Sequence, residues 1–345
     1  MAPLVDAPLR KFPPAPASAN APASAHAPAI PQSELKMALV PARPASFTKH
    51  VFQFAGEEYV YRLYLPGTSP AAQAPVLPLL VLLHGCKQDA ADFSAGTAMN
   101  LLAEQRQCMV LYPEQPPKAN QLRCWNWFET KHQSRGAGEP AMLAALTHKV
   151  LASYPADPDR VYVAGLSAGG AMAALVAGLY PELFAAVGVH SGLPSGAASG
   201  MFSALIAMRR GSRRTSGKAG KNEVMPTIVF HGSADTTVHP DNGDQVVAFA
   251  LAGWRASGLV LEKSQRSEVG QRLTVRDMYS AADGKSYVEL WSVSSGPHAW
   301  SGGNSAGSFT DPLGPSASLA MLNFFLRHHK SAVSHQRQGL PSQTR

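Results

Sequence analysis

The stretch RVYVAGLSAGGAMAALVAG, residues 160–178, changes its secondary-structure preference at a single serine. Its first residues combine apolar alternation with β-branched side chains, which is typical of a strand. The residues after Ser167 are rich in Ala and Leu, which favour a helix. Gly165 and Gly169 lie two positions before and two positions after the serine. A strand that passes directly into a helix through such a turn is typical of α/β folds.

Strand and helix patterns alternate along the rest of the chain, which predicts one doubly wound α/β domain with a mostly parallel sheet. Residues 49–67 predict an antiparallel hairpin, which would add edge strands. Helical spacing begins at Ser94, a candidate N-cap, and recurs in later segments. The other predicted strands are 76–85, 108–114, 184–192, 226–235, 272–280 and 286–293, and the other predicted helices are 139–154, 241–258 and 315–330.

The two ends and one internal segment differ from this pattern. Residues 1–45 are dominated by Ala and Pro and predict a disordered segment or stiff linker. Residues 46–330 form the predicted catalytic domain. Within it, residues 193–223 predict a Gly/Ser/Arg-rich basic insertion, favoured as a loop over a lid, with one helical piece near residue 201. Residues 331–345 predict a frayed polar tail.

Composition excludes several classes of protein. The chain has 345 residues, 45% of them apolar, and a formal net charge of +7. The chain contains no run of eighteen apolar residues, so no membrane span is predicted. The basic residues gather in the insertion and the tail, with no recognisable nucleic-acid-reading element. The N-terminal segment lacks the apolar core of a secretion signal. Oligomeric state is not predicted.

Three cysteines, Cys86, Cys108 and Cys124, leave at least one thiol free. Cys108 lies in a predicted strand and is expected to be a buried small apolar residue. Cys86 and Cys124 lie in predicted loops and could pair. Their scattered spacing argues against a structural zinc site, and no metal or organic cofactor is predicted.

Residues 165–169 match the pattern G-x-S-x-G, in which a serine hydroxyl stands exposed on a strained turn. Side chains at the two glycine positions would collide at such a turn. The helix that follows directs free N–H groups toward developing negative charge. The pattern alone can be purely structural, but here it has the required strand before it and helix after it. Ser167 is therefore the candidate nucleophile.

A serine nucleophile needs a base, which in this arrangement follows an acid later in the chain. Asp235 comes directly after a buried predicted strand, and His298 lies in a glycine-rich loop after another. Asp241 and Asp244 are rival acids, but they fit better as charges in the first turn of a helix. Loops at the carboxyl ends of parallel strands meet in one crevice. The sequence therefore predicts Ser167, Asp235 and His298 as a catalytic triad.

The remaining histidines near these loops have a different interpretation. His84, His190, His231 and His239 each precede or crowd the acid instead of following it on a separate strand. They are predicted to be loop-packing residues. The oxyanion hole is assigned to two backbone N–H groups, because tetrahedral intermediates need such donors. One comes from Ala168 and the other from Cys86 in the segment HGC.

Several blocks resemble the poly(3-hydroxybutyrate) depolymerase family of esterases, which are α/β-hydrolases related to feruloyl and acetylxylan esterases. The matching blocks are LLHGCKQDAADF, RCWNWF, DRVYVAGLSAGGAMAA, FAAVGVHSG, IVFHGSADTTVHPDNG and GPHAWSGG. The resemblance implies a carboxylic-ester hydrolase that works through an acyl-enzyme on poly- or oligo-3-hydroxybutyrate. It implies the same triad, an oxyanion contact at Cys86 and a Cys86–Cys124 disulfide. It also implies an extracellular or periplasmic location, with a cytoplasmic one as the alternative.

Other interpretations stay open. A feruloyl or acetylxylan esterase shares the same motifs, and a serine peptidase of the same fold ranks below both. A non-catalytic binding protein would be expected to lose a member of the triad. Trp125, Trp127 and Trp300 are candidates for a substrate pocket, with core packing an equal alternative.

Overall fold

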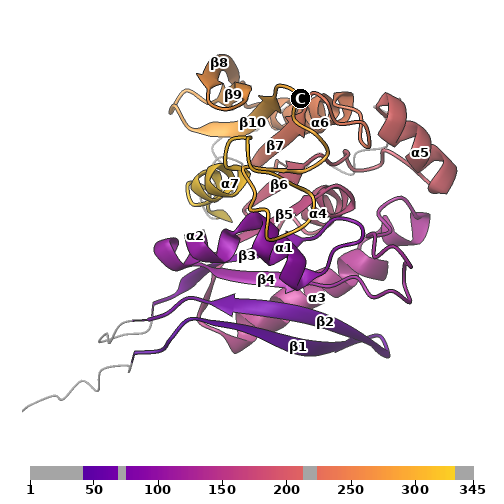
Figure 1. The fold of residues 1–345 in the computed structure, drawn as a ribbon, viewed down its shortest axis with the longest axis vertical. Helices are drawn as coiled ribbons and strands as arrows, with labels where there is room; N and C mark the ends of the chain where they lie inside the picture. The colour runs from indigo at the N-terminus through magenta and orange to yellow at the C-terminus, as the bar shows by residue number, and fades with distance from the viewer. Residues whose placement is uncertain (1–41, 69–74, 213–223, 331–345) are drawn as a thin grey trace, which may run out of the picture. The chain divides into compact units, whose positions relative to one another are not determined.

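The computed structural model describes residues 42–68, 75–212 and 224–330, and these contain a 10-stranded sheet. The strand order is β1-β2-β4-β3-β5-β6-β7-β10-β9-β8, and the strands from β4 to β10 in this order run parallel. This confirms the predicted α/β-hydrolase architecture (Figure 1). The strands are β1 (Ser46–Phe54), β2 (Glu57–Leu65), β3 (Leu77–Leu83), β4 (Met109–Pro113), β5 (Ala156–Leu166), β6 (Ala186–His190), β7 (Thr227–Gly232), β8 (Glu262–Val269), β9 (Leu273–Ser280) and β10 (Ser286–Val293).

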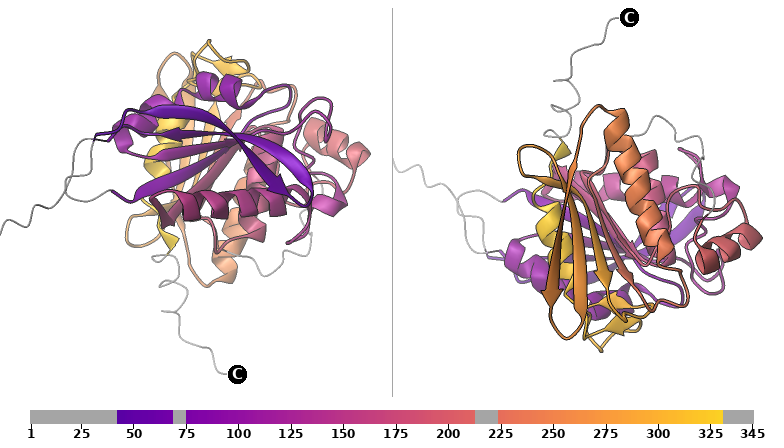
Figure 2. Two further views of the ribbon diagram at one scale, coloured as in Figure 1. Left: turned by 90° about the horizontal axis from the view of Figure 1, so that it is seen from below. Right: turned by 90° about the horizontal axis from the view of Figure 1, so that it is seen from above.

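Helices cover both faces of the sheet, and each layer has its own apolar core. The helices are α1 (Ala90–Thr97), α2 (Met99–Arg106), α3 (Gly138–Ser153), α4 (Ala168–Leu179), α5 (Met201–Arg210), α6 (Asp241–Ala256) and α7 (Ala317–Phe325). Side chains of α3, α4 and α6 pack in one cluster, and those of α1, α2 and α7 in the other. Figure 2 shows α6 and α7 on opposite sides of the sheet. The central strands are therefore buried on both faces.

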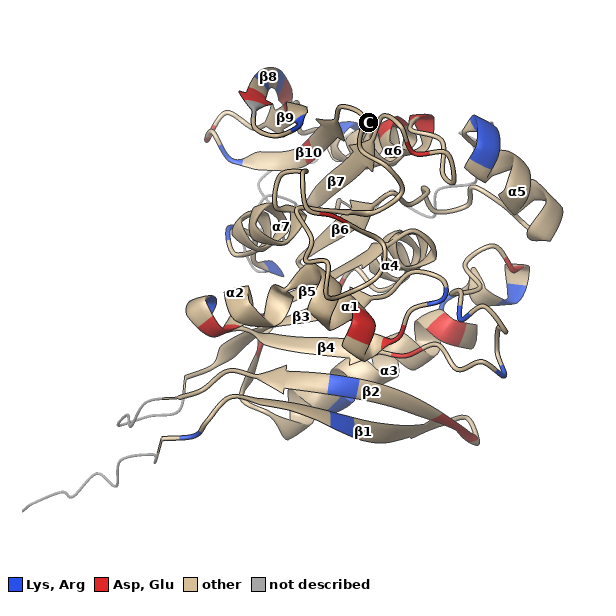
Figure 3. Ribbon diagram, viewed as in Figure 1, with Lys and Arg blue, Asp and Glu red and all other residues tan. Residues whose placement is uncertain are grey.

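The central strands have the composition that this burial requires. Every residue of β3, β4, β6 and β7 is buried. None of these strands contains Lys, Arg, Asp or Glu, so they are tan in Figure 3. Burying an unpaired charge costs far more than burying an apolar side chain. Such continuous apolar runs are the pattern that predicts parallel strands buried on both faces.

The two edges of the sheet are antiparallel. β1 and β2 pair as the predicted hairpin around Ala55 and Gly56. At the other edge β9 and β10, which lie where two strands were predicted, pair antiparallel, and β8 adds a further antiparallel strand that the sequence did not predict. Nearly every residue that can be described in β8 is exposed and polar, so it lacks the apolar alternation that marks a half-buried strand.

The predicted cap at Ser94 is wrong. The first helix begins at Ala90, and Asp89 is its N-cap, with a side chain that accepts hydrogen bonds from Ala91 N and Asp92 N. Ser94 lies buried inside α1. The predicted single helix is also two, because Ala98 adopts φ 50° and separates α1 from α2. An aspartate cap satisfies free N–H groups at a helix start at least as well as a serine does.

The predictions made for residues 1–41, 213–223 and 331–345 lie outside the described residues. The described part of the predicted insertion contains α5, which coincides with its predicted helical piece. None of the helices in residues 42–68, 75–212 and 224–330 is long and apolar enough to cross a membrane.

Three buried histidines predict that the protein loses stability in mild acid. Burial lowers the pKa of His84 to about 4 and the pKa of His190 and His328 to about 3. In the unfolded chain each pKa is about 6.5. Between these values the unfolded state binds protons that the folded state does not. The free energy of unfolding should therefore fall as pH decreases below 6.5, by up to about 4 kcal/mol per pH unit for the three groups together.

Urea unfolding at a series of pH values between 7 and 5 measures this slope. The variant His328→Phe removes one of the three groups, so its slope should be shallower by up to about 1.4 kcal/mol per pH unit. Equal slopes for the variant and the wild type would show that His328 is protonated in the folded protein.

Candidate active site

Ser167 occupies a sharp turn between β5 and α4. Its backbone has φ 59° and ψ −120°, a left-handed region that residues with a side chain rarely adopt. Two backbone hydrogen bonds hold it there: Ser167 N donates to His190 O at 2.8 Å, and Ala171 N donates to Ser167 O at 3.0 Å. The turn therefore presents the Ser167 side chain at the carboxyl end of the parallel sheet.

The two flanking glycines are required by close backbone contact. A Cβ on Gly165 would lie 2.4 Å from the carbonyl carbon of Gly169, and one on Gly169 would lie 2.1 Å from Leu83 O. These distances are much shorter than real Cβ contacts, and the obstructing atoms belong to the backbone. The steric reason given for the G-x-S-x-G pattern is therefore visible in the contacts of this turn.

The structure brings the three predicted triad residues together. His298 Nε2 lies 2.9 Å from Ser167 Oγ, and His298 Nδ1 lies 2.7 Å from Asp235 Oδ2. Ser167 follows β5, Asp235 follows β7 and His298 follows β10, so each comes from the carboxyl end of a different strand. The hydrogen bonds form a continuous path from the carboxylate through the imidazole to the hydroxyl.

The Asp235 carboxylate is buried but well supplied with donors. Thr237 N and Val238 N both donate to its Oδ1, at 2.9 and 2.8 Å. His231 Nε2 lies 3.4 Å from Oδ2, on which His298 also converges. Burial by itself would raise the pKa of Asp235, but hydrogen bonds from His231, His298 and the backbone outweigh it and hold this pKa far below its usual range. The group is therefore a carboxylate at neutral pH.

The rival acids lie elsewhere. Asp241 and Asp244 are both in the first turn of α6, as the alternative interpretation predicted. Asp241 Oδ1 lies 3.4 Å from Nδ1 of His239, which is half exposed. No contact links either of these carboxylates to His298 among the residues that the structure describes. Asp235 is thus the acid next to the candidate base.

His84, His190 and His231 are buried and each joins two segments of backbone. His84 Nε2 accepts from Gln115 N at 3.1 Å, and His231 Nε2 donates to Val238 O at 2.9 Å. His190 Nε2 accepts from Ser301 N at 2.9 Å. These contacts agree with the loop-packing interpretation of the three histidines.

The loop after β3 carries Cys86 and is held from several sides. Gly85 N donates to the Gln88 side chain at 2.9 Å, and the Trp125 indole N–H donates to His84 O at 3.1 Å. Cys86 is also joined to Cys124 by a disulfide that spans 38 residues. The sequence analysis did not single out Gln88, although it lies within the block HGCKQ. Its role depends on a contact that only the folded loop creates.

The three tryptophans proposed as pocket candidates are all buried. Trp125 and Trp300 are almost fully enclosed, and the Trp300 indole N–H donates to Ser318 Oγ at 2.9 Å. Trp127 packs edge-on against Phe128. These contacts account for each side chain as core packing. A direct role with substrate is left as a prediction.

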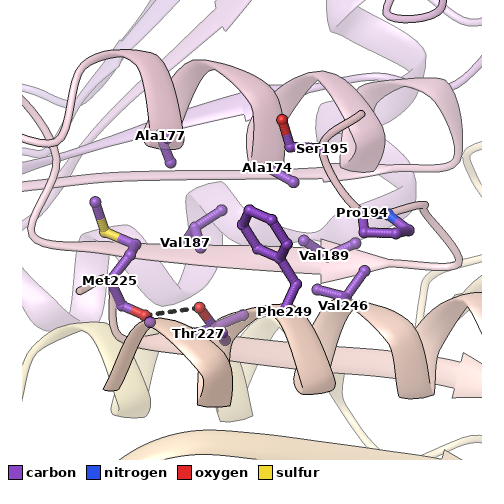
Figure 4. Close-up of a pocket in the computed structure, with 13 residues that line it drawn as sticks. Ala174, Ala177, Val187, Val189, Pro194, Ser195, Met225, Thr227, Val246 and Phe249 are labelled. Atoms are coloured by element: carbon purple, nitrogen blue, oxygen red, sulfur yellow. Dashed lines mark hydrogen bonds between the residues drawn. The ribbon is translucent and has the colours of Figure 1, made fainter. Parts of the chain in front are cut away.

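An apolar groove lies against the C-terminal half of α4. It runs between α4 and α6 over β6 and β7, and Figure 4 shows Phe249 and Val246 facing Val187 and Val189 across it. Its lining contains none of the predicted site residues. The candidate chemistry therefore stays at the Ser167 turn. Among the described residues, no group of three or more His, Cys, Asp and Glu side chains is arranged to hold a metal ion.

Comparison with known families agrees with this geometry. The family model described as esterase PHB depolymerase matches residues 59–267, more than half of the chain. The chain belongs to the esterase PHB depolymerase family. The matched region of this family member contains Ser167 and Asp235, and His298 follows it in the sequence.

Curated relatives carry related names. The family member is 36% identical over 188 residues to poly(3-hydroxyalkanoate) depolymerase C of Paucimonas lemoignei, covering 52% of this chain and 45% of that protein. It is 31% identical over 159 residues to feruloyl esterase B of Neurospora crassa, covering 46% and 53%. It is 26% identical over 255 residues to poly(3-hydroxybutyrate) depolymerase of Ralstonia pickettii, covering 70% and 51%. The chain thus spans about half the length of these relatives.

Solved structures share the fold of this esterase PHB depolymerase family member. An acetyl xylan esterase from Aspergillus awamori superposes with a TM-score of 0.58 at 20% identity, covering 81% of this chain and 98% of that one. An acylaminoacyl peptidase from Pyrococcus horikoshii superposes with a TM-score of 0.53 at 14% identity, covering 84% and 42%. These similarities support the α/β-hydrolase fold.

Two glycine substitutions in α4 test the steric account of the turn. Gly169→Ala should destabilise the protein by more than about 4 kcal/mol, because its Cβ would overlap backbone atoms that cannot move aside. Gly178→Ala is the matched control, since a Cβ there meets nothing within 4 Å. That substitution should stabilise the helix by about 0.5–1 kcal/mol. Urea unfolding of both variants measures the difference, and similar midpoints would contradict the steric account.

Proposed function

We propose that this protein is a serine carboxylic-ester hydrolase that works through Ser167, His298 and Asp235. The observation that carries the proposal is the continuous hydrogen-bonded path from Asp235 Oδ2 through His298 to Ser167 Oγ. The membership of an esterase family supports the same class of reaction. A serine hydroxyl in this setting has a base within reach of its proton and an anion that orients the base.

The proposed reaction has two halves. His298 takes the proton from Ser167 as the hydroxyl oxygen attacks the ester carbonyl, and Asp235 stabilises the imidazolium that forms. His298 then gives this proton to the departing alcohol oxygen, which leaves an acyl group on Ser167. In the second half, His298 removes a proton from water, whose oxygen attacks the acyl carbon. The acid product departs and Ser167 regains its proton.

The negative charge of the two tetrahedral intermediates lies on the former carbonyl oxygen. Its stabilisation is assigned to hydrogen bonds from the N–H groups of Ala168 and Cys86. Ala168 is the first residue of α4, where backbone N–H groups have no partner within the helix. Cys86 lies in the loop after β3. Leu83, the last residue of β3, is in contact with Gly169. The contact between this loop and the Ser167 turn supports their assignment to one oxyanion hole.

The favoured substrate is an ester of a hydroxyalkanoate, such as an oligomer of 3-hydroxybutyrate. Two of the curated relatives are named as depolymerases of such polyesters. The second candidate is a feruloyl or acetylxylan ester. It is favoured by the 31% identity to feruloyl esterase B of Neurospora crassa and by 30% identity over 182 residues to acetylxylan esterase A of Talaromyces purpureogenus.

The disulfide between Cys86 and Cys124 supports an extracellular or periplasmic location, because such bonds persist in oxidising compartments. Cys108 is buried and burial raises the pKa of its thiol to about 12, so this cysteine is poorly suited to exchange with the disulfide. Fractionation of the native cells, with the thiols counted by mass in each fraction, tests the location. Reduced protein in the cytoplasm would contradict it.

Substitutions at the triad test the mechanism. Ser167→Ala should abolish hydrolysis of p-nitrophenyl butyrate, because it removes the attacking oxygen. Asp235→Asn should lower kcat by about 10³–10⁴, because the amide cannot stabilise the imidazolium and favours the wrong tautomer. Asp241→Asn is the matched control, as its carboxylate is exposed and outside the path, and should leave kcat within about twofold. Turnover by folded Ser167→Ala would contradict the mechanism.

A panel of esters tests the substrate. Purified protein should hydrolyse 3-hydroxybutyrate oligomers with a higher kcat/KM than methyl ferulate or acetylated xylo-oligosaccharides. Release of acid from each substrate, measured at equal molar concentration, gives the comparison. A preference for either of the other two esters would replace the favoured substrate and leave the mechanism intact.

A further inference from the structure

His190 lies directly between the nucleophile and the loop that carries the base. It is the last residue of β6, the strand that lies between β5 and β7 in the sheet. Its side chain is almost completely buried. The reaction proposed above gives it no chemical task. A buried polar ring at this place needs partners for both nitrogens, and those partners show what it joins.

The main chain of His190 contacts the nucleophile turn. Its carbonyl oxygen accepts the hydrogen bond from Ser167 N at 2.8 Å. This bond continues the pairing of β5 with β6 to the residue that follows the end of β5. Because Ser167 has a strained backbone, the bond helps to hold a conformation that the residue would otherwise leave.

The side chain of His190 contacts the other half of the site. Its Nε2 accepts from Ser301 N at 2.9 Å, three residues after His298. Its Nδ1 lies 3.2 Å from Ser191 Oγ. The ring is stacked between Phe230 and Trp300, with centroids 5.7 and 5.0 Å away. The two stacked rings and the bond from Ser301 N restrain the ring in the orientation in which Nε2 faces the loop that carries His298.

The imidazole is suited to accept this bond. Burial, together with the nearby His231 and His298, lowers the pKa of His190 to about 3, while Asp235 opposes the shift. The ring is therefore neutral, with its proton on Nδ1 and a lone pair on Nε2. A protonated ring would place an N–H against the N–H of Ser301.

The loop that carries His298 needs such an anchor on the C-terminal side of this residue. Before His298, the loop is joined to the segment after β7 by hydrogen bonds from Ser233 N to Val293 O and from Ala234 N to Gly296 O. After His298, Trp300 N donates to Phe309 O. The next backbone N–H, that of Ser301, donates to His190 Nε2. The His298 loop is thus fixed at both ends, and His190 is the anchor that reaches the strand of the nucleophile.

We propose that His190 is a positioning residue for the esterase reaction, holding Ser167 with its carbonyl oxygen and the His298 loop with its ring, so that the two reacting groups stay at one separation. This role rests on the proposed function of Ser167 and His298. Misplacement of a reacting group by about 1 Å can cost about 100-fold in rate. The expected loss falls on kcat, because the ring does not lie at the surface and does not meet substrate.

Two substitutions separate the hydrogen bond from the packing of the ring. His190→Phe keeps an aromatic ring between Phe230 and Trp300 but removes the acceptor for Ser301 N. It should lower kcat on p-nitrophenyl butyrate by about 10- to 100-fold, with KM within about twofold of wild type. His190→Gln offers an amide oxygen at a similar reach, and its kcat should stay within about threefold of wild type. Rates are taken per folded molecule, counted by titration of the active serine with a fluorophosphonate.

His328→Phe is the matched control. His328 is equally buried and neutral, and it contacts Tyr287 and Phe324 instead of the candidate site. The His328→Phe variant should be less stable than the wild type but keep its kcat. A kcat for His190→Phe equal to that of His328→Phe would overturn the positioning role. If His190→Phe does not fold, His190→Gln decides, and a tenfold loss of kcat there would overturn it.

Failure of the proposed function has a different signature. If hydrolysis by the wild type does not depend on Ser167, the proposed function is wrong and the role of His190 falls with it. If hydrolysis depends on Ser167 while both His190 variants keep the wild-type kcat, the proposed function stands and the positioning role is wrong.

Discussion

The close backbone contact between the Ser167 turn and the end of β3 is the constraint on which the candidate site depends. A Cβ on Gly169 would lie 2.1 Å from Leu83 O and 2.5 Å from His84 O, so only glycine allows this approach. The same contact places the loop of Cys86 beside the first turn of α4. The glycines of the serine turn thereby also allow the close approach of the two segments that carry the N–H groups assigned to the oxyanion hole. A shift of this turn would disturb both halves of the proposed chemistry.

Around this contact, three buried histidines hold the loops at the carboxyl edge of the sheet. His84 joins the loop after β3 to Gln115, which follows β4. His231 closes the loop that carries Asp235, and His190 reaches from β6 to the loop that carries His298. An imidazole suits this use because it can donate from one nitrogen and accept at the other within a flat ring. For His84 and His190 the cost is a dependence on the neutral ring, which together with His328 is the reason for the expected loss of stability in mild acid.

The sequence predicted the central strands and the triad because both have local signatures. Continuous apolar runs mark strands that are buried on both faces, and the order of serine, acid and histidine follows from the order of the loops. Other elements had no such signature. β8 is almost entirely exposed and polar, so nothing in its pattern distinguishes it from a loop. The break at Ala98 falls within a helical pattern, because alanine is a strong helix former and its φ of 50° is imposed by the surroundings.

The sequence by itself determined which residue types stand at the ends of the parallel strands, and hence which side chains the fold could bring together. It ranked the acids and histidines by their order in the chain, and only the structure shows which of them are in contact. Asp235 differs from Asp241 and Asp244 by its place directly after β7, where two backbone N–H groups and two histidines surround it. His190 differs from His298 in its contacts, since its ring faces Ser301 N and the stacked aromatic rings. Those contacts join residues far apart in the chain, and only the packing of the sheet and its loops decides them.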